Sequence, residues 1–207
     1  MRGRRKKWAV PYLEEHPETV LTELDASLPF FASDKLYLEV GIGKGDFIIG
    51  LSAKQPGHYL GIEREENVLA MAARKVVEGS HEDIRLLSGD FDEYLEDLGA
   101  LRFDAIYLNF SDPWPKKKHW KRRLTVANRL KAMAELLKPG AKIIVKTDNV
   151  GLYEFTLEQI PLAGLVCEYE TADYQFDEER DAMSEYERRF RDLGQPIHRI
   201  IIRKEGE

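Results

Sequence analysis

The stretch "KLYLEVGIGKGDF", residues 35–47, joins an apolar run to three closely spaced glycines and then to the start of a helical pattern. The run at 35–40 is short and almost continuously apolar, which predicts a buried strand. Gly41, Gly43 and Gly45 follow directly, and glycine permits positive φ angles and close approach of a ligand to the backbone. The stretch therefore predicts a strand, a ligand-binding turn and a helix in immediate succession.

The same alternation of strands and helices continues along the chain. Short apolar runs predict further strands at 58–63, 84–89, 103–110, 141–147, 165–171 and 197–203, the last two forming a hairpin. Longer patterns predict helices at 17–28, 45–54, 65–78, 91–98, 124–137, 150–160 and 180–192. The helix at 124–137 is expected to carry Lys138 in its final turn and to stop at Pro139-Gly140. The sequence therefore predicts an α/β fold with a single doubly wound, mostly parallel seven-stranded sheet and an antiparallel last strand.

The composition suits one soluble domain over residues 1–207, since the chain has 207 residues and 43% of them are hydrophobic. Residues 1–16 form a basic N-terminal arm that could be flexible. No apolar run approaches the roughly 18 residues that cross a bilayer, and the N-terminus lacks the apolar stretch of a signal peptide. Cys167 is the only cysteine and the histidines are scattered, so we expect a reducing cytoplasm, no disulfide and no metal. The residues leave both a monomer and a homodimer open.

Positive charge is concentrated in two segments. Residues 2–7 carry +5 and residues 116–123 carry +6, and neither segment contains an acid. Since the whole chain carries −6, all the other residues together carry −17. Positive charge concentrated on an acidic body predicts a local site for an anion such as a nucleic-acid backbone. The open alternative is a solvated segment, which applies most readily to residues 2–7.

Acids surround the glycine loop. Asp46 stands where the dinucleotide fingerprint needs its third glycine, so the pattern G-x-G-x-G is not that fingerprint. Glu39 precedes the loop, Glu63 ends the second strand and Asp90 follows the third. Such carboxylates would repel a pyrophosphate but suit a cofactor with an amine and ribose hydroxyls. We therefore expect S-adenosylmethionine, with Glu63 on the ribose and Asp90 near the adenine, although each acid alone could be a solvated strand end.

The loop "NFSDPWPKKKHWKRR", residues 109–123, follows the fourth predicted strand and opens onto the same edge of the sheet. Pro113 and Pro115 bias the residues before them, Asp112 and Trp114, toward extended backbone. We expect a stiff turn that aims Asp112 at the methyl donor. The lysines and arginines after it would contact phosphates, which position a nucleic acid while base contacts specify it.

This loop resembles the signature of the bacterial tRNA (guanine-N7)-methyltransferases. Four other segments of the chain also resemble this family and occur in the same order as in the family: "LEVGIGKGDF" (38–47), "YLGIE" (59–63), "KTDN" (146–149) and "SEYERRF" (184–190). The resemblance covers about residues 36–203. It implies the Rossmann-like class I methyltransferase fold, tRNA as partner, and methyl transfer from S-adenosylmethionine to N7 of the variable-loop guanosine at tRNA position 46.

The resemblance also implies roles for single residues. Cofactor contacts are implied for Glu39, Gly41, Gly43, Glu63, Asp90 and Asp112, and Asp112 is also the implied catalytic acid. Substrate contacts are implied for Lys116, Asp148, Ser184, Glu185, Tyr186 and Glu187, and RNA contacts for Lys118, His119, Trp120, Lys121, Arg122 and Arg123. Ser184 departs from the family, which usually has threonine there, but it keeps a hydroxyl. From the residues alone, His119 has no role and Asp112 could instead cap a turn.

Two other functions remain open at this point. The first is an S-adenosylmethionine-dependent enzyme that methylates an exocyclic amine on nucleic acid. Such enzymes also carry a proline–aromatic motif after the fourth strand, but their prolines are usually adjacent, whereas Trp114 separates them here. The second is a non-catalytic RNA-binding protein with a relic cofactor pocket, against which the intact Glu39 and Glu63 argue.

Overall fold

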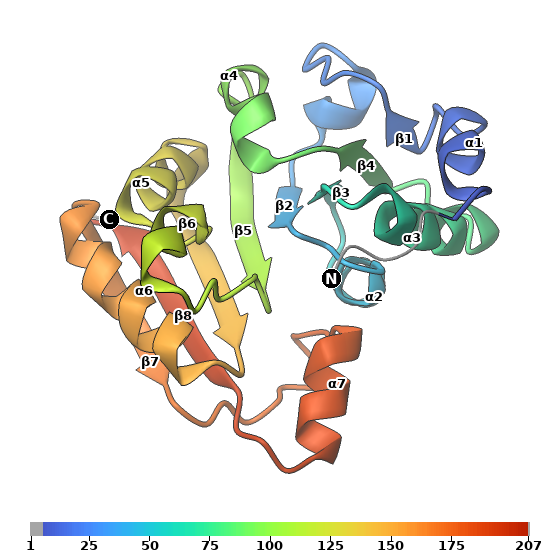
Figure 1. Ribbon diagram of the computed structural model, residues 1–207. Coiled ribbons are helices and arrows are strands. Elements are labelled where there is room, and N and C mark those ends of the chain that lie inside the picture. The colour runs from blue at the N-terminus through green and yellow to red at the C-terminus, as the bar shows by residue number, and fades with distance from the viewer. Residues whose placement is uncertain (1–5, 207) are drawn as a thin grey trace.

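The structure, a computed structural model, describes residues 6–206 without the side chain of Lys117 (Figure 1). Its strands are β1 (Val20–Leu21), β2 (Leu36–Val40), β3 (His58–Glu63), β4 (Ile84–Ser88), β5 (Phe103–Asn109), β6 (Leu137–Thr147), β7 (Leu165–Thr171) and β8 (His198–Lys204). Its α-helices are α1 (Ala9–Glu14), α2 (Asp46–Ser52), α3 (Glu66–Glu78), α4 (Leu95–Leu98), α5 (Ala127–Glu135), α6 (Val150–Leu162) and α7 (Glu185–Asp192). Its 3₁₀ helices are η1 (Pro29–Ala32), η2 (Phe91–Tyr94) and η3 (Lys117–Arg122). Strands and helices alternate from β2 to α6, as the sequence predicts.

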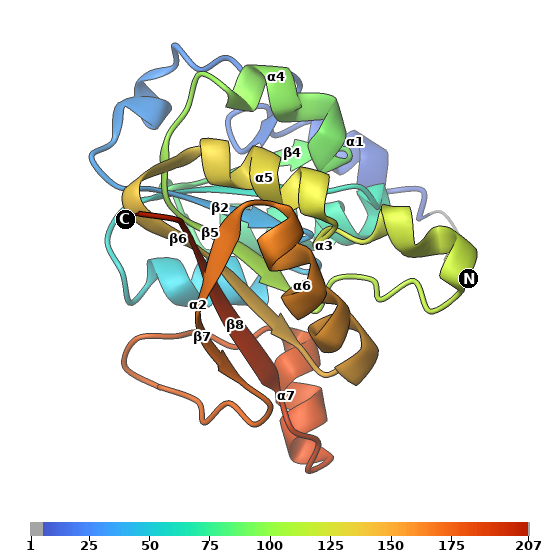
Figure 2. The same ribbon diagram turned by 90° about the vertical axis from the view of Figure 1, so that its left-hand side faces the viewer.

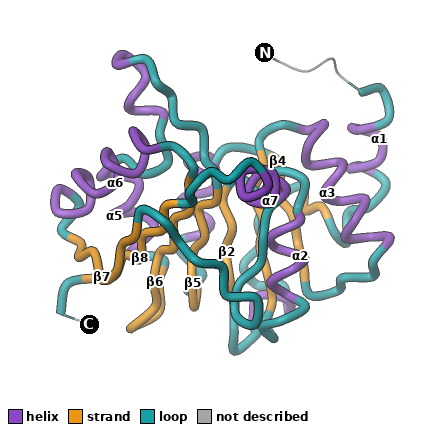
Figure 3. The backbone as a smooth tube through the Cα atoms, turned by 90° about the horizontal axis from the view of Figure 1, so that it is seen from below, coloured by secondary structure: helices purple, strands orange, loops and turns teal. Residues whose placement is uncertain are grey.

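The strands form a single sheet in the order β1-β4-β3-β2-β5-β6-β8-β7. Neighbouring strands pair in parallel, except that β8 runs antiparallel to both β6 and β7. Figure 3 shows the strands following one another from β7 to β4. The predicted sheet with its reversed last strand is confirmed, and the two-residue β1 adds an eighth strand at one edge. The order changes direction between β2 and β5, which places ligand sites beyond the carboxyl ends of these strands.

Helices cover both faces of the sheet. Every residue of β2 is buried, which explains the continuous apolar run in this segment. One core cluster joins the sheet to α5 and α6, with Leu130 and Ile160 among its members. The other joins the sheet to α1, α2 and α3 through side chains such as Leu13, Phe47 and Leu69. Figure 1 accordingly shows α5 and α6 on one side of the strands and α2 and α3 on the other.

The helix predicted at 17–28 is wrong. This segment contains β1 instead, and η1 begins just after it at Pro29. The Leu86 N–H donates to the carbonyl oxygen of Thr19 at 2.8 Å, and Val20 lies opposite Leu86 in the parallel pair. The free edge of β4 offers backbone partners, and this tertiary pairing outweighs a weak local helical pattern.

The helix predicted at 124–137 is shorter than expected, because α5 ends at Glu135 and β6 begins two residues later. The expected stop, Pro139-Gly140, lies inside β6, where the pairing with β5 shifts its register. Lys138, expected in the last helical turn, instead places its Nζ 2.6 Å from Oδ2 of Asp104. The ion pair and the sheet therefore capture a segment that the sequence pattern assigns to the helix.

Two further helices begin later than predicted. Residues 91–94 form η2, so that α4 covers only the second half of the predicted helix at 91–98. α7 begins at Glu185 rather than at 180, because Ser184 caps it: the Ser184 Oγ accepts the Glu187 N–H at 3.1 Å.

Residues 6–16, predicted as part of a basic arm, contact the body of the protein. α1 packs against α3 with two of its side chains buried, and the Lys6 N–H donates to Oδ1 of Asn67 at 2.7 Å. The predicted arm also includes Arg2, Arg4 and Arg5, which lie outside the described residues. Within the described part of the chain, no helix has both the length and the apolar character needed to span a bilayer.

Candidate active site

A cleft of about 870 Å³ lies beyond the carboxyl ends of β2, β3, β5 and β6, where the sheet order reverses. Figure 1 shows these strands pointing toward the side on which α7 lies. Many predicted site residues line the cleft, namely Glu39, Gly41, Gly43, Glu63, Asp90, Asp112, Arg122, Asp148, Ser184, Glu185 and Tyr186. The fold thus brings together the glycine loop, the loop after β5 and the start of α7, which are far apart in the sequence.

The glycine loop folds back onto β3. The N–H groups of Gly41 and Ile42 donate to the Ile62 carbonyl at 2.8 and 3.2 Å. Gly41 and Gly43 have φ angles of +80° and +57°, and a Cβ on either would meet no described atom within 4 Å. Gly61 in β3 provides the space for this fold, since a Cβ there would lie 2.8 Å from Cγ2 of Ile42. The loop therefore presents bare backbone to the cleft and needs glycine on both sides of the contact.

Glu39 lies at the bottom of the cleft and is only 3% exposed. Its Oε1 accepts a hydrogen bond from Nδ2 of Asn109 at 2.8 Å, whereas its Oε2 has no hydrogen-bond partner within residues 6–206. Burial raises the pKa of this carboxyl to about 8, although the bond from Asn109 lowers it. Glu39 therefore takes up a proton more readily than an exposed glutamate, and its second oxygen is available to a cationic ligand, which would favour the charged carboxylate.

Glu63 ends β3 and is oriented by two backbone donors. The Gly43 N–H donates to its Oε2 and the Glu65 N–H to its Oε1, each at 3.0 Å. Burial raises the pKa of this carboxyl, and the two hydrogen bonds oppose the rise. Each carboxylate oxygen has a second lone pair, so Glu63 can still accept hydrogen bonds from hydroxyl groups in the cleft.

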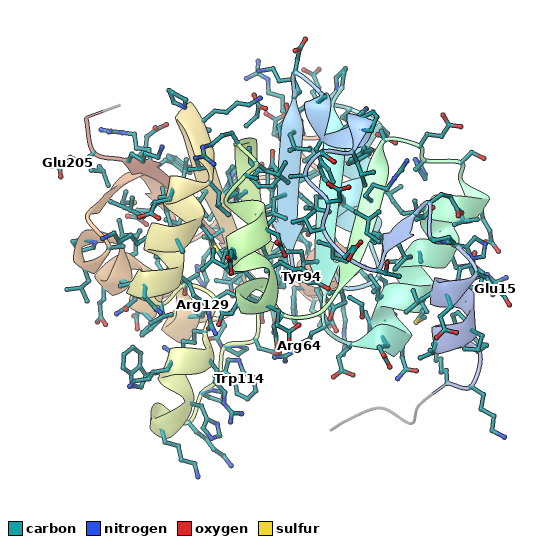
Figure 4. The ribbon with its side chains drawn as sticks, turned by 90° about the horizontal axis from the view of Figure 1, so that it is seen from above. Glu15, Arg64, Tyr94, Trp114, Arg129 and Glu205 are labelled. Atoms are coloured by element: carbon teal, nitrogen blue, oxygen red, sulfur yellow. The ribbon has the colours of Figure 1, made fainter. Side chains whose placement is uncertain are left out.

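Arg64 lies between two other acids of the cleft, Asp90 and Asp112. Its Nη2 is 2.6 Å from Oδ2 of Asp112, and its Nη1 is 4.0 Å from Oδ1 of Asp90. Its guanidinium also lies 5.7 Å from the ring centroid of Trp114, and Figure 4 shows both residues on the same side of the molecule. The Asp112 side chain is 63% exposed, and such ion pairs contribute at most about 1 kcal/mol. A ligand can therefore replace Arg64 on Asp112 at little cost.

The loop after β5 is not extended throughout. Trp114 has a φ angle of +41°, so the predicted extended backbone is wrong at this residue. Arg123 fixes the turn: its Nε donates to the carbonyl oxygen of Pro113 at 2.8 Å, and its Nη2 to that of Trp114 at 3.4 Å. The Arg122 guanidinium lies over the Trp114 ring at 5.0 Å. These tertiary contacts stabilise a strained conformation that the local preference before Pro115 opposes.

The basic segment after this turn forms η3, which projects away from the sheet (Figure 2, yellow-green). Its exposed side chains are those of Lys118, Trp120, Lys121 and Arg122, together with Lys116 at its N-terminal end. His119 meets the Trp114 ring edge-on, with 5.8 Å between the ring centroids. Arg123 differs from the other predicted RNA contacts, because its guanidinium holds the turn and lies 4.3 Å from the Phe155 ring centroid.

The first turn of α7 forms another wall of the cleft. Lys44 of the glycine loop and Glu185 are joined by an ion pair of 2.7 Å, and Tyr186 is 54% exposed at the edge. Glu187 is different, since it is 0% exposed and its Oε2 accepts a hydrogen bond from Nζ of Lys146 at 2.6 Å. The structure therefore does not bring Glu187 together with the other predicted substrate contacts, because its side chain is enclosed in the core and does not line the cleft.

Three further residues in or behind the cleft received no individual role from the sequence: Arg64, Asn109 and Lys146. Lys146 does carry a signal, because it interrupts the apolar run of a predicted buried strand, where a charge requires a buried partner. Asn109 ends such a run in the same way. Arg64 carries none, since an arginine just after a strand is ordinary, and only the folded chain places it beside Asp112.

The fold and the cleft together define a class I methyltransferase. The reversed last strand and the glycine loop at the switch point are the features of this class that the structure shows. Precorrin-6y C5,15-methyltransferase from Geobacter metallireducens has a similar structure, with a TM-score of 0.59 over 99% of this chain and 90% of that chain. The two sequences are 14% identical, so this likeness concerns the fold alone.

Sequence comparison gives the family. A family described as "Putative methyltransferase" matches residues 33–200. The tRNA (guanine-N(7)-)-methyltransferase of Limosilactobacillus reuteri is 38% identical over 97% of this chain and 98% of the relative. The protein of the same name from Bacillus subtilis is 37% identical over 98% of each chain. The chain belongs to this family of tRNA (guanine-N(7)-)-methyltransferases, which confirms the resemblance of its motifs.

Proposed function

We infer that the protein transfers a methyl group from S-adenosylmethionine to N7 of a guanine in tRNA, giving N7-methylguanosine. The observation that carries this inference is the cleft, in which the glycine loop, Glu39 and Glu63 lie together with Asp112 beside the basic segment η3. The names of the relatives support tRNA as the partner. We extend the proposal to the variable-loop guanosine at position 46 as the target and to the cytoplasm as the location.

The residues of the cleft fit this cofactor. The Oε2 of Glu39 lacks a partner among the described residues, and an ammonium group would supply one. Gly41 and Gly43 present open backbone, and Glu63 can accept the ribose hydroxyls. When bound, S-adenosylmethionine supplies an electrophilic methyl group on a positively charged sulfur.

Asp112 and Asp148 are the candidates for contact with the guanine, since both line the cleft. Guanine N7 has a lone pair and no proton, so the protein need not remove a proton from the attacking atom. Orientation of the reactants is then the main task, and it supplies roughly 7–11 kcal/mol in favourable cases. The base becomes positively charged as the methyl group is transferred, and a carboxylate beside it stabilises that charge. The same carboxylates can accept the N1–H and N2–H groups of guanine, which adenine does not present.

The segment η3 is the candidate contact for the tRNA backbone. Lys118, Lys121 and Arg122 are exposed next to the cleft, where cationic side chains position a nucleic acid through its phosphates. A base that is stacked in the folded tRNA has to be opened before it enters the cleft, which costs a few kcal/mol.

Transfer of labelled methyl from S-adenosylmethionine to tRNA from cells that lack N7-methylguanosine tests this function. We expect label in the tRNA and, after borohydride reduction, aniline cleavage at the labelled position, because this treatment breaks the chain at N7-methylguanosine. Label without cleavage would assign the methyl group to another atom, such as an exocyclic amine. Absence of label from every such tRNA would contradict the enzymatic function.

A further inference from the structure

Lys146 and Glu187 form a buried ion pair between the sheet and α7, outside the cleft. Their side chains are 1% and 0% exposed. Nζ of Lys146 lies 2.6 Å from Oε2 of Glu187 and 3.1 Å from Oδ2 of Asp181. It also donates to the carbonyl oxygen of Ala182 at 2.9 Å. One buried ammonium group thus gathers three acceptors from residues 181–187, the segment that leads into α7.

The acids of this cluster are satisfied as well. Oε1 of Glu187 accepts a hydrogen bond from Nη2 of Arg191 at 2.9 Å. The Tyr174 hydroxyl donates to Oδ2 of Asp181 at 3.0 Å. The carboxylates of Glu187 and Asp181 are therefore hydrogen-bonded to the side chains of Lys146, Arg191 and Tyr174. Because buried charges are tolerated only when they are paired and hydrogen-bonded, this cluster favours one placement of the segment over all others.

The ion pair decides which side of α7 lines the cleft. Glu187 points toward Lys146, whereas residues 184–186 line the cleft. Rotation of α7 about its axis would break the ion pair and carry Tyr186 away from the cleft at the same time, since both residues lie in the first helical turn. Asp148, which follows Lys146 by two residues, lines the cleft at the end of β6. The Lys146–Glu187 ion pair therefore joins the α7 wall of the cleft to the end of β6.

We propose that Lys146 and Glu187 are positioning residues for methyl transfer. Their ion pair holds the α7 wall against the end of β6, so that the target base fits between Asp148 and Tyr186, and neither residue of the pair touches the substrate. This proposal rests on the proposed function for the identity of the base. Even a small displacement of the α7 wall would matter, because a shift of about 1 Å can lower turnover by roughly a hundredfold.

The test compares three variants: Lys146→Met, Glu187→Gln and the double variant. Lys146→Met removes the ammonium group that Glu187 and Asp181 share, and Glu187→Gln leaves Lys146 with Asp181 as its remaining carboxylate. The double variant removes the Lys146–Glu187 ion pair. We expect each single variant to lower kcat/KM for tRNA by roughly thirtyfold to a hundredfold. The double variant should be no worse than the single variants, because the two residues act as one unit. The affinity for S-adenosylhomocysteine should stay within about threefold, since the acids proposed to hold it lie outside this cluster.

Lys142 and Glu168 provide a matched control. They form an ion pair that also starts from β6, but it is partly exposed and neither residue lines the cleft. Lys142→Met combined with Glu168→Gln removes the same two kinds of charge. This variant should keep the kcat/KM and the cofactor affinity of the wild type.

Amide hydrogen exchange over residues 185–192 gives a readout besides activity. In the double variant these amides should exchange at least about tenfold faster, while unchanged exchange in β2 and β3 checks that the fold is kept. Lost activity with unchanged exchange, or losses that multiply in the double variant, would instead assign Glu187 a direct substrate contact.

Full activity in the double variant would show that the pair positions nothing. If the wild type failed to methylate tRNA, the proposed function would be contradicted. Hydrogen exchange and S-adenosylhomocysteine binding would still show whether the ion pair holds α7 in place, because neither measurement requires methyl transfer.

Discussion

Asp112 is a proposed guanine contact whose carboxylate already has a charged partner in the structure. In the free protein its carboxylate is paired with Arg64 at 2.6 Å. The pair is exposed and contributes little stability, so the N–H groups of a guanine can take the place of the guanidinium. Arg64 then remains beside Asp90 and Trp114, where it can balance the acids of the cleft.

Asp112→Ala should lower kcat for methyl transfer by at least about a hundredfold, because it removes a carboxylate proposed to stabilise the charge on the base. The affinity for tRNA should stay within about tenfold, since phosphate contacts dominate such binding. Single-turnover methyl transfer and filter binding measure the two quantities. Asp97→Ala, an exposed acid of α4 outside the cleft, is the control. Turnover near that of the wild type would make Asp112 a structural residue of the turn.

Glu39 should make the stability of the free protein depend on pH. The folded protein keeps the Glu39 proton up to about pH 8, whereas the unfolded chain loses it near pH 4.5. Between these values the unfolded state binds fewer protons, so the contribution of Glu39 to the free energy of unfolding falls as the pH rises. Glu39→Gln has no such proton to lose. Urea unfolding should therefore show the variant gaining stability relative to the wild type from pH 5 to pH 8; parallel pH profiles would contradict the raised pKa.

At the residue scale, the sequence predicts the acids of the cleft because each stands next to the carboxyl end of a strand, and parallel strands bring those ends together. It does not predict that Glu187 is buried or that Trp114 has a positive φ angle. Both outcomes depend on a cation from a distant segment, Lys146 in one case and Arg123 in the other. Partners of this kind follow from the folded chain and have no fixed spacing in the sequence.

Among the elements, η3 should determine the salt dependence of tRNA binding. Replacement of Lys118, Lys121 and Arg122 by glutamine should weaken binding and reduce the slope of log K against log salt by roughly 0.7–0.9 for each lost phosphate contact. Binding measured at several salt concentrations gives this slope. Lys131→Gln, an exposed lysine on α5, is the control for charge alone. A slope unchanged in the triple variant would mean that η3 does not meet phosphates.

Arg123→Gln should behave differently from the η3 variant. This side chain holds the carbonyl groups of Pro113 and Trp114. Its loss should relax the turn and lower turnover, with little effect on the salt dependence of tRNA binding. This result would distinguish the structural role of Arg123 from the phosphate contacts proposed for the exposed cations of η3.

The elements themselves differ in how far the sequence predicts them. The bounds of β3 and β7 agree to the residue with the apolar runs at 58–63 and 165–171. The near-continuous apolar run identifies β3, because this strand is covered on both faces. β7 is a largely exposed edge strand, and its valine, tyrosine and threonine identify it through their strand preference instead. The predictions are wrong around β1 and at the start of β6, because pairing with β4 and β5 decides the structure there rather than local preference.

For the whole molecule, cofactor binding should raise the stability of the fold. At about 100 times its Kd, S-adenosylhomocysteine should add about 2.7 kcal/mol to the free energy of unfolding, which corresponds to a rise in Tm of roughly 5–10 °C for a chain of this size. Thermal unfolding at several ligand concentrations measures the effect. ATP should give no comparable rise, because its phosphates would meet the acids Glu39 and Glu63. Equal stabilisation by S-adenosylhomocysteine and ATP would contradict the proposed cofactor site.

The position of β8 between β6 and β7 has a consequence for biosynthesis. The ribosome releases β7 before it releases the strand that attaches β7 to the sheet. A nascent chain that has emerged only as far as residue 196 can already form the glycine loop and the parallel part of the sheet, but it exposes the open side of β6 and an unpaired β7. Such edges pair readily with other chains. A translational pause at this point would therefore leave a polypeptide able to enclose its cofactor yet prone to aggregation, and the seven residues of β8 would end that exposure.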